Sequence, residues 1–287
     1  MNSLTAKQCR QFAEQGYLQV PGVLDEEDLT PLRRVIDTAV DRIATSLYDE
    51  GEIPDVYETV PAQQRLFKLL GPDAEWTWNK EIFSAEIHEL LTQPKLLDII
   101  ESLIGPEITV HGDYWLRFKM PAGEPSAFPW HQDSVYYNAN MAPGQQQTPT
   151  EESQILTVWI PLVDVDKQNG PLQLVSGSHR HGLQPARRNA KGRRVPLIDV
   201  ETLGPVETQT MRVGDVLIFG NLTFHRSLAN DSDAIRWSID LRYSPTDAPL
   251  DWFREMWPGF IARSRSNPGA VEAWEIWQAR RGSPAAR

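Results

Sequence analysis

Apolar residues recur at helical spacing through much of the first hundred residues. Residues 3–16 carry apolar side chains on one stripe and end at a glycine, which predicts a helix. A second helix is predicted over 25–47, because acidic residues open it and apolar residues follow at helical spacing. The third helical segment, 84–105, contains Pro94 and closes at a Gly-Pro pair. Residues 17–24 between the first two helices predict a short strand and a turn.

The periodicity changes to two between Ile108 and Ser244. Short runs of alternating apolar and polar residues are separated there by glycine, proline, asparagine and aspartate, which is typical of strands and turns. Many short strands without intervening helices predict an antiparallel sandwich or barrel of the jelly-roll kind. The predicted strand segments are 108–120, 154–165, 170–178, 206–213, 215–221 and 234–244.

These patterns predict one domain over 1–287, because all-β folds of this length often form a single unit. It has a mainly helical part (1–105), a jelly-roll core with the candidate site (106–247) and a Trp-rich extension that is helical in places (248–287). The Gln-, Thr- and Pro-rich segment 139–153 predicts a surface loop, a kind that often covers a site. The sequence does not determine the oligomeric state or the role of the extension.

The net charge, the single cysteine and the lack of long apolar runs exclude several classes of partner and site. The net charge of −11 argues against binding to nucleic acid or an anionic membrane surface, because both attract basic proteins. Cys9 is the only cysteine, so an intramolecular disulfide and thiolate zinc sites are excluded. The N-terminal residues lack the apolar stretch of a signal peptide, and no apolar run approaches membrane-spanning length. We therefore expect a cytoplasmic protein that is not anchored in a membrane.

The segment FPWHQDSVYYN, residues 128–138, contains the first candidate metal ligands. Residues two apart on a strand point to the same face, so His131 and Asp133 would present an imidazole and a carboxylate side by side. His225 follows a strand-like run and is the leading candidate for a third ligand. Two histidines and one carboxylate form the facial triad of non-haem Fe(II) oxygenases, which leaves coordination positions open. On its own, however, a His-x-Asp pair is more often a hydrogen-bonded turn.

A rival metal pair lies in the segment GSHRHG, where His179 and His181 are two residues apart. Glycines bracket this pair as a tight turn, which favours a structural role over metal binding. His88 in a predicted helix and His111 in a predicted strand are interpreted as packing or surface residues.

Downstream of His225, the predicted strand 234–244 carries a row of polar residues on one face and apolar residues on the other. The polar row is costly to bury unless it binds a ligand or pairs internally. Arg236, eleven residues after His225, has the planar fork of donors that suits a carboxylate. The alternative is an internal ion pair of Asp240 with Arg236 or Arg242.

Together, the ordered set His131, Asp133, His225 and Arg236, with Ser227 two residues after His225, resembles the phytanoyl-CoA dioxygenase family of Fe(II)/2-oxoglutarate oxygenases. The segments GYLQVPGVLDEEDL, NGPLQLVSGSHRHG and VGDVLIF add to the resemblance, which covers about residues 10 to 245.

This resemblance implies a double-stranded β-helix of the jelly-roll type with helices packed outside it. It implies that His131, Asp133 and His225 hold Fe(II), and that 2-oxoglutarate and dioxygen fill the open positions. Arg236 would bind the distal carboxylate of 2-oxoglutarate with help from Ser227, and Trp159 matches a position near the cosubstrate. The expected reaction hydroxylates a C–H bond of a small-molecule metabolite and releases succinate and carbon dioxide. Because related halogenases lack the carboxylate, Asp133 favours hydroxylation, although desaturation or cyclisation stays open.

Four further residues are candidates for contact with the substrate. Tyr136 and Tyr137 follow the metal motif, and Arg117 with Lys119 could project into the barrel toward a substrate or cosubstrate carboxylate. Packing or solvated roles are the alternatives for all four. The basic run within 185–194 could hold an anionic substrate, but charge runs are usually solvated. Two other functions stay open: a cupin enzyme with metal on His179 and His181, and a non-catalytic binding protein on the same barrel.

Overall fold

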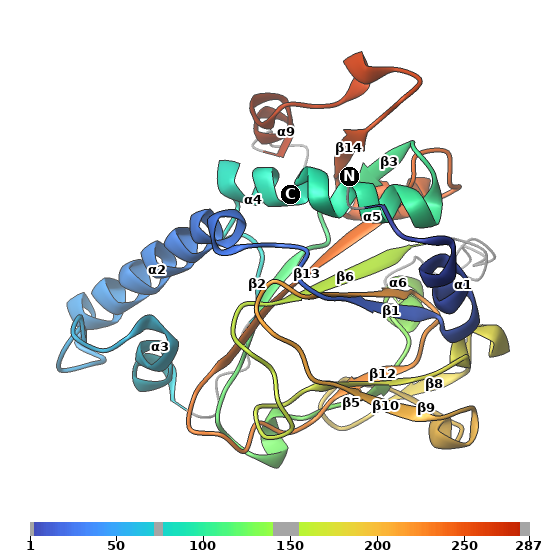
Figure 1. Cartoon of the computed structure of the whole chain (residues 1–287). Helices are drawn as coiled ribbons and strands as arrows, with labels where there is room; N and C mark the ends of the chain where they lie inside the picture. The colour runs from blue at the N-terminus through green and yellow to red at the C-terminus, as the bar shows by residue number, and fades with distance from the viewer. Residues whose placement is uncertain (1–2, 72–76, 140–154, 282–287) are drawn as a thin grey trace.

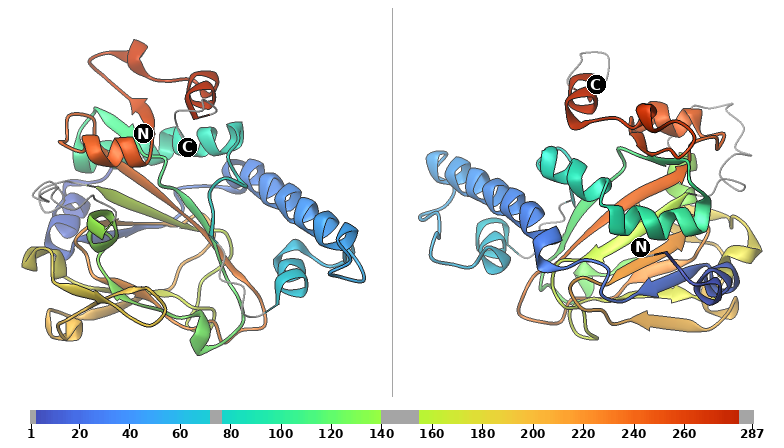
Figure 2. Two further views of the ribbon diagram at one scale, coloured as in Figure 1. Left: turned by 180° about the vertical axis from the view of Figure 1, so that it is seen from behind. Right: turned by 45° about the horizontal axis from the view of Figure 1, so that its top comes forward.

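Two antiparallel sheets lie face to face in the computed structural model, which describes residues 3–71, 77–139 and 155–281. Most helices lie outside the two sheets, and the short helix α6 lies between them at one end, as Figures 1 and 2 show from three directions. This arrangement confirms the predicted jelly-roll fold with flanking helices.

The large sheet has eight strands in the order β1-β11-β6-β13-β3-β14, with β4 beside β13 and β2 beside β4. Its central strand, β13, alternates between two buried faces, because one face meets the apolar core and the other faces the small sheet. The strands are β1 (Tyr17–Val20), β2 (Thr77–Trp78), β3 (Ile108–Val110), β4 (Trp115–Lys119), β6 (Leu156–Pro161), β11 (Val216–Gly220), β13 (Arg236–Pro245) and β14 (Phe260–Arg263).

The small sheet has the order β10-β7-β12-β5, and a separate hairpin of β8 and β9 lies next to it. In this sheet β12 pairs with β5 so that His225 lies directly opposite His131. The register of these two short strands therefore brings together residues that are more than ninety positions apart. The strands are β5 (Phe128–His131), β7 (Leu172–Val175), β8 (Ala186–Arg188), β9 (Arg194–Pro196), β10 (Val206–Gln209) and β12 (His225–Ser227).

The first two helices begin at capping residues. Thr5 caps the first helix and Asp25 the second, each within a capping box, and Gly16 ends the first helix in the left-handed conformation. A Cβ on Gly16 would lie 2.4 Å from Nδ1 of His179, so this helix end also requires close approach. The helices are α1 (Ala6–Gln15), α2 (Glu26–Asp49), α3 (Ala62–Leu70), α4 (Ala85–Leu91), α5 (Pro94–Ile104), α6 (Ser134–Ala139), α8 (Asp251–Met256) and α9 (Trp274–Arg281), with 3-10 turns at Glu124–Ser126, Ser178–His181, Val200–Thr202 and Pro268–Ala270.

Two features of the helical part differ from the sequence prediction. The segment 84–105 forms two helices, because Pro94 begins α5 and has no backbone N–H to continue the hydrogen bonds of α4. Helix α3 was not predicted. Residues 140–153 of the predicted surface loop lie outside the described residues.

The C-terminal extension contributes to the sheet as well as to the helices. Its strand β14 pairs with β3, and Trp277 of α9 is fully buried in the main hydrophobic cluster. That cluster extends from Val23 through the large sheet to Trp277, so the helical part, the barrel and the extension share one core. The single-domain organisation of the whole chain stays a prediction. In the described part of the chain, no helix has both the length and the apolarity needed to cross a membrane.

Candidate active site

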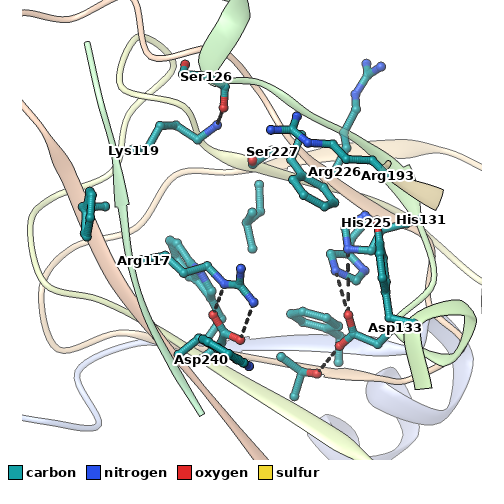
Figure 3. Close-up of a pocket in the computed structure, with 18 of the residues that line it drawn as sticks. Arg117, Lys119, Ser126, His131, Asp133, Arg193, His225, Arg226, Ser227 and Asp240 are labelled. Carbon is teal, nitrogen blue, oxygen red and sulfur yellow. Dashed lines mark hydrogen bonds and ion pairs between the residues drawn. The ribbon is translucent and has the colours of Figure 1, made fainter. Parts of the chain in front are cut away.

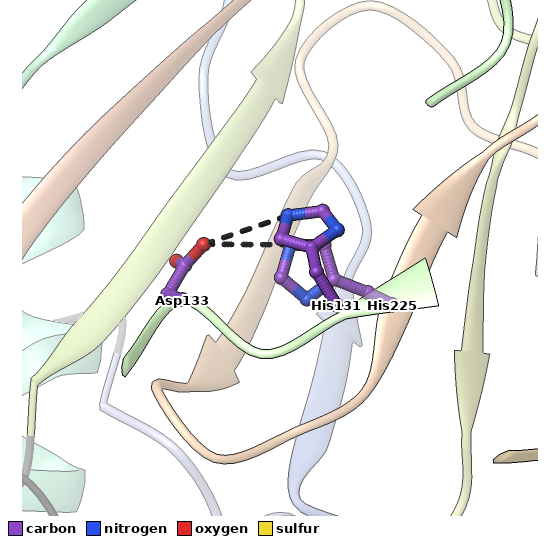
Figure 4. Close-up of side chains that lie close together, drawn as sticks. All are labelled: His131, Asp133 and His225. Atoms are coloured by element: carbon purple, nitrogen blue, oxygen red, sulfur yellow. Dashed lines mark ion pairs between the residues drawn. The ribbon is translucent and has the colours of Figure 1, made fainter. Parts of the chain in front are cut away.

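The three predicted metal ligands lie together between the sheets. Nε2 of His225 is 3.6 Å and Nε2 of His131 is 3.8 Å from Oδ1 of Asp133. One ligand atom from each residue lies within 4.8 Å of the other two, and all three side chains are buried. Figure 4 shows both imidazole rings beside the Asp133 carboxylate. Among the described residues, this is the one group of at least three such side chains that could hold a metal ion.

The local geometry differs from the expected strand alternation. His131 is the last residue of β5, and Asp133 lies in the turn that leads into α6. The buried Gln132 side chain fixes this turn, because its Nε2 donates to the carbonyls of Gly182 and Leu222. The prediction that one strand presents both ligands was therefore wrong, although the two side chains do meet.

Hydrogen bonds select the nitrogen that each histidine offers. Nδ1 of His131 lies 2.9 Å from the carbonyl of Pro129, and Nδ1 of His225 lies 3.0 Å from that of Thr223. A carbonyl can only accept, so each Nδ1 carries the proton and each Nε2 lone pair faces Asp133. Burial lowers the pKa of His131 to about 3 and also lowers the pKa of His225. Both rings are therefore neutral near pH 7, as metal binding requires.

The Asp133 carboxylate is held by its second oxygen. Oδ2 accepts a 2.7 Å hydrogen bond from Oγ1 of Thr157 and lies 3.3 Å from Nη2 of Arg242. Burial raises the pKa of Asp133, but Arg242 and the two histidines together lower it by a larger amount. The pKa of Asp133 therefore lies below its ordinary value. The carboxylate is thus ionised, with Oδ1 left to face the histidines.

A cavity of about 650 Å³ opens beside this group (Figure 3). Side chains from both sheets, from α6 and from the β8–β9 hairpin line it, together with Trp257, which follows α8. The cavity brings together every residue that the sequence predicted for the site: Arg117, His131, Asp133, Tyr136, Tyr137, Trp159, His225, Ser227 and Arg236.

Arg236 has the features of an anion-binding residue. Its guanidinium is buried over the Trp159 ring, 5.4 Å from the ring centroid, and Nη1 donates a 2.5 Å hydrogen bond to Ser238. Its Nε is buried and finds no hydrogen-bond partner among the described residues. Burial and the charge of Arg117 lower the Arg236 pKa to about 10. A carboxylate beside Arg236 would satisfy both the orphaned donor and the charge, which fits 2-oxoglutarate.

The predicted internal ion pair exists, but it involves Arg242 rather than Arg236. Nη1 of Arg242 lies 2.8 Å from Oδ2 of Asp240, and Arg117 grips the same carboxylate through Nε and Nη2. Arg242 also lies 3.7 Å from Asp113. This network uses Asp240, the one acid of the polar row, and leaves Arg236 without a carboxylate partner among the described residues.

The two tyrosines lie on α6 and have hydrogen-bond partners. The Tyr137 hydroxyl accepts from Nε of Arg242 at 2.9 Å, and the Tyr136 hydroxyl accepts from the backbone N–H of Arg194 at 3.1 Å. The Tyr136 ring also contacts the His131 ring, with centroids 5.5 Å apart. Tyr136 therefore contacts the candidate metal ligand His131, whereas Tyr137 is hydrogen-bonded to Arg242.

The basic run divides into two groups. Lys191 and Arg193 line the cavity, and the Arg193 guanidinium lies 4.7 Å above the Phe128 ring. Arg187 and Arg188 are exposed on β8, as expected for solvated charges. Within the described residues, seven basic and three acidic side chains line the cavity: Arg117, Lys119, Lys191, Arg193, Arg226, Arg236 and Arg242 against Asp113, Asp133 and Asp240.

The other histidines have structural surroundings. Nε2 of His179 lies 3.2 Å from the carbonyl of Ala13, and His181 is exposed in the same 3-10 turn. His88 stacks on Phe260, and His111 is buried 2.9 Å from Oγ of Ser244. Neither His179 nor His181 joins a metal-ligating cluster within the described residues.

Sequence reasoning missed two residues that orient the Asp133 carboxylate. Thr157 was overlooked, and Arg242 was interpreted only as a partner of Asp240. Thr157 lies opposite Arg242 in the pairing of β6 with β13, two residues before Trp159 on the same strand face. The alternation that places Trp159 toward the cavity could therefore have identified Thr157.

The fold and the three ligands define a class of protein: a jelly-roll oxygenase with a two-histidine, one-carboxylate metal site. The family model of phytanoyl-CoA dioxygenase (PhyH) matches residues 12–238. The chain therefore belongs to the phytanoyl-CoA dioxygenase family. The predicted enzyme class, an Fe(II)/2-oxoglutarate-dependent dioxygenase that uses dioxygen, is confirmed by this membership and by the relatives below.

Two curated relatives are similar over most of the chain. The 1-deoxypentalenic acid 11-beta-hydroxylase of Streptomyces exfoliatus is 26% identical over 253 residues, which cover 83% of this chain and 81% of the relative. The ectoine dioxygenase of Bordetella parapertussis is 23% identical over 271 residues, covering 87% and 78%. Among solved structures, the epimerase SnoN in complex with Fe3+, alpha ketoglutarate and nogalamycin RO has a TM-score of 0.54 at 20% identity, covering 83% of this chain and 82% of that one.

Proposed function

We propose that the protein hydroxylates an unactivated C–H bond of a small-molecule metabolite while 2-oxoglutarate is converted to succinate and carbon dioxide. The observation that carries this proposal is the meeting of two features in one cavity. One is the group of His131, Asp133 and His225, and the other is the buried, incompletely hydrogen-bonded guanidinium of Arg236.

In this proposal His131 and His225 bind Fe(II) through Nε2, and Asp133 binds it through Oδ1. Bound Fe(II), with 2-oxoglutarate and dioxygen, supplies the oxidising chemistry that replaces hydrogen by hydroxyl. Arg236 receives the distal carboxylate of 2-oxoglutarate through its fork of donors, and Ser227, which lines the same cavity, supplies a hydroxyl.

The surrounding residues hold the ligands in place before the metal binds. The backbone carbonyls of Pro129 and Thr223 fix both imidazoles in the tautomer that leaves Nε2 free. Thr157 and Arg242 occupy Oδ2 of Asp133, which leaves Oδ1 for the metal. Because Asp133 supplies a carboxylate, one coordination position is taken, which favours hydroxylation over halogenation.

The size of the cavity supports a small-molecule substrate, since about 650 Å³ lies within the usual range of small-ligand pockets. Tyr136 lies beside His131 and Arg117 lies on another wall, so both are proposed to contact the substrate. Tyr137 is buried against Arg242 and is proposed to support the site rather than to select the substrate. The absence of a nucleic-acid partner and the cytoplasmic location stay predictions from the sequence.

A metabolite screen tests the proposal. Purified protein with Fe(II), 2-oxoglutarate and labelled dioxygen should release succinate in a substrate-dependent manner. Hydroxylation predicts one labelled oxygen atom in succinate and one in the product. A product that lacks the label but has lost two hydrogen atoms would replace hydroxylation by desaturation or ring formation. Failure of 2-oxoglutarate to bind the Fe(II)-loaded protein would contradict the proposal as a whole.

A further inference from the structure

We propose that the substrate carries an anionic group, a carboxylate or a phosphate, and that Arg117 binds this group across the cavity from the metal ligands. This inference rests on the proposed function and specifies its substrate class. It is carried by the position of Arg117, by the charge of the cavity walls and by the aromatic residues next to Arg117.

Arg117 is bonded to Asp240 at two points and lines the cavity. Nε and Nη2 donate to the two oxygens of Asp240, with the Nη2 bond at 3.1 Å. The Arg117 side chain is nevertheless 40% exposed, whereas Asp240 is 3% exposed. Arg117 lines the cavity, and Nη1 is the guanidinium nitrogen that the bonds to Asp240 leave over for a ligand. Figure 3 shows this guanidinium projecting from one wall, with His131, Asp133 and His225 on the other side.

The charge of the cavity walls favours an anion. Basic side chains outnumber acidic ones by seven to three among the described lining residues, although the whole chain has a net charge of −11. All three acids already have partners: Asp133 contacts Thr157 and Arg242, Asp240 contacts both arginines, and Asp113 accepts from the Trp115 indole at 2.6 Å. Fe(II) carries two positive charges and 2-oxoglutarate carries two negative charges. When both bind, the excess of positive charge on the cavity walls is therefore unchanged.

Arg117 and Arg236 have separate tasks in this arrangement. They lie close enough that the charge of Arg117 lowers the pKa of Arg236. Arg236 lies on the Trp159 ring, whereas Arg117 is fixed by Asp240. Two arginines that repel each other in one cavity are both stabilised when each binds its own anion. We assign the cosubstrate to Arg236 and the substrate to Arg117.

The neighbouring residues indicate an apolar or cyclic body attached to the anionic group. Trp115 lies two residues before Arg117 on the same face of β4 and makes an edge contact with Trp257, at 5.5 Å between ring centroids. Both rings line the cavity. Aromatic faces next to a fixed guanidinium suit an organic acid or phosphate ester better than an inorganic anion.

Matched probes test the inference on the anaerobic protein loaded with Fe(II) and saturated with 2-oxoglutarate. Phenylacetate and benzyl phosphate carry the anion, and phenylacetamide is an uncharged control of similar shape. Binding is followed by thermal stabilisation, while the visible charge-transfer band of the Fe(II)–2-oxoglutarate complex reports that the cosubstrate stays in place. We expect at least one anionic probe to bind about tenfold more tightly than the amide, with the band retained. The better of the two anions identifies a carboxylate or a phosphate as the preferred group.

Arg117→Met should reduce this preference to about twofold or less, because it removes the charged fork and keeps an unbranched side chain. Arg117→Lys should keep part of the preference through its charge. Arg187→Met, at an exposed arginine outside the cavity, is the matched control and should bind all probes as the wild type does.

Four results would overturn the inference: equal binding of amide and anions, no anion binding at about 10 mM probe, loss of the band as an anion binds, or weaker 2-oxoglutarate binding as the main effect of Arg117→Met. The last two results would mean that Arg117 belongs to the binding site of 2-oxoglutarate rather than to that of the substrate. A wild-type protein that never forms the band would instead contradict the proposed function itself.

Discussion

The two faces of β13 are equally buried, yet they do different things. Trp237, Ile239, Leu241 and Tyr243 point into the main hydrophobic cluster beneath the helices. Arg236, Ser238, Asp240 and Arg242 point the other way, and all of them except Ser238 line the cavity beside the candidate metal ligands. One strand thus stabilises the fold with its apolar side chains and contributes its polar ones to the candidate active site.

The buried charges along this strand are stabilised in two different ways. Asp240 and Arg242 compensate each other within the protein, so their burial requires no ligand. Arg236 has a hydroxyl and an aromatic face but no carboxylate among the described residues. Its burial costs free energy until an anion binds, which supports our proposal that Arg236 binds the cosubstrate carboxylate.

The largest expected effect is on the apolar face. Leu241→Ala should lower the free energy of unfolding by about 2–5 kcal/mol, because it removes a fully buried side chain and leaves a cavity. Chemical denaturation measures the loss, and the folded variant should still bind Fe(II) and 2-oxoglutarate. Unchanged stability would mean that this face does not support the core.

Next in size is the effect of Arg236→Met on the polar face. The affinity for 2-oxoglutarate should fall about 100-fold, since two charge-assisted hydrogen bonds are lost. The melting temperature of the metal-free variant should stay equal or rise, because a buried charge without a carboxylate partner disappears. Calorimetric titration and thermal melting measure the two effects. A clear drop in stability with unchanged 2-oxoglutarate affinity would mean that Arg236 supports the fold and does not bind the cosubstrate.

A smaller effect is expected at the oxygen of Asp133 that faces away from the histidines. Thr157→Val removes the hydrogen bond to Oδ2 but keeps the shape of the side chain, and it should weaken metal binding about tenfold. Competition with a coloured chelator measures the change. The control is Thr109→Val. Thr109 is also buried, but it lies on β3 and hydrogen-bonds to Thr246, so this variant should leave metal affinity unchanged. Equal affinity in the two variants would show that Thr157 does not position the carboxylate.

The effect that is smallest near pH 6, and that grows as the pH falls, concerns His111, which contacts Ser244 at the far end of the polar row. Burial, with Arg254 and Arg242 nearby, lowers its pKa from 6.5 to about 3. The unfolded chain therefore takes up a proton below pH 6.5 that the folded protein takes up only near pH 3. Stability falls across this window by at most about 1.4 kcal/mol per pH unit from this group. His111→Gln should show a flatter dependence in denaturation at several pH values, and an identical slope would contradict the buried neutral histidine.

Local patterns predict much of this architecture. The capping residues Thr5 and Asp25 fix two helix starts, and the alternation of apolar and polar residues along 234–244 separates the two faces of β13. The spacing of His131, Asp133, His225 and Arg236 identifies the family because chemistry constrains those residue types. All four lie in the cavity.

Other features depend on contacts between distant segments and could not be predicted locally. Asp133 lies in a turn that Gln132 anchors to segments fifty and ninety residues later, which no period-two pattern encodes. The pairing of β14 with β3 and the burial of Trp277 likewise arise from tertiary packing. Lys191 and Arg193 have the same local pattern as the exposed Arg187, but the β8–β9 hairpin brings only the former two to the cavity.

Anaerobic titration of the metal-free protein with Fe(II) and then 2-oxoglutarate tests the central claim most directly. The wild type and His179→Ala should both develop the visible charge-transfer band of chelated 2-oxoglutarate, and His225→Ala should not. No band in the wild type, an undiminished band in His225→Ala, or loss of the band in His179→Ala would contradict the assignment of the iron site to His131, Asp133 and His225.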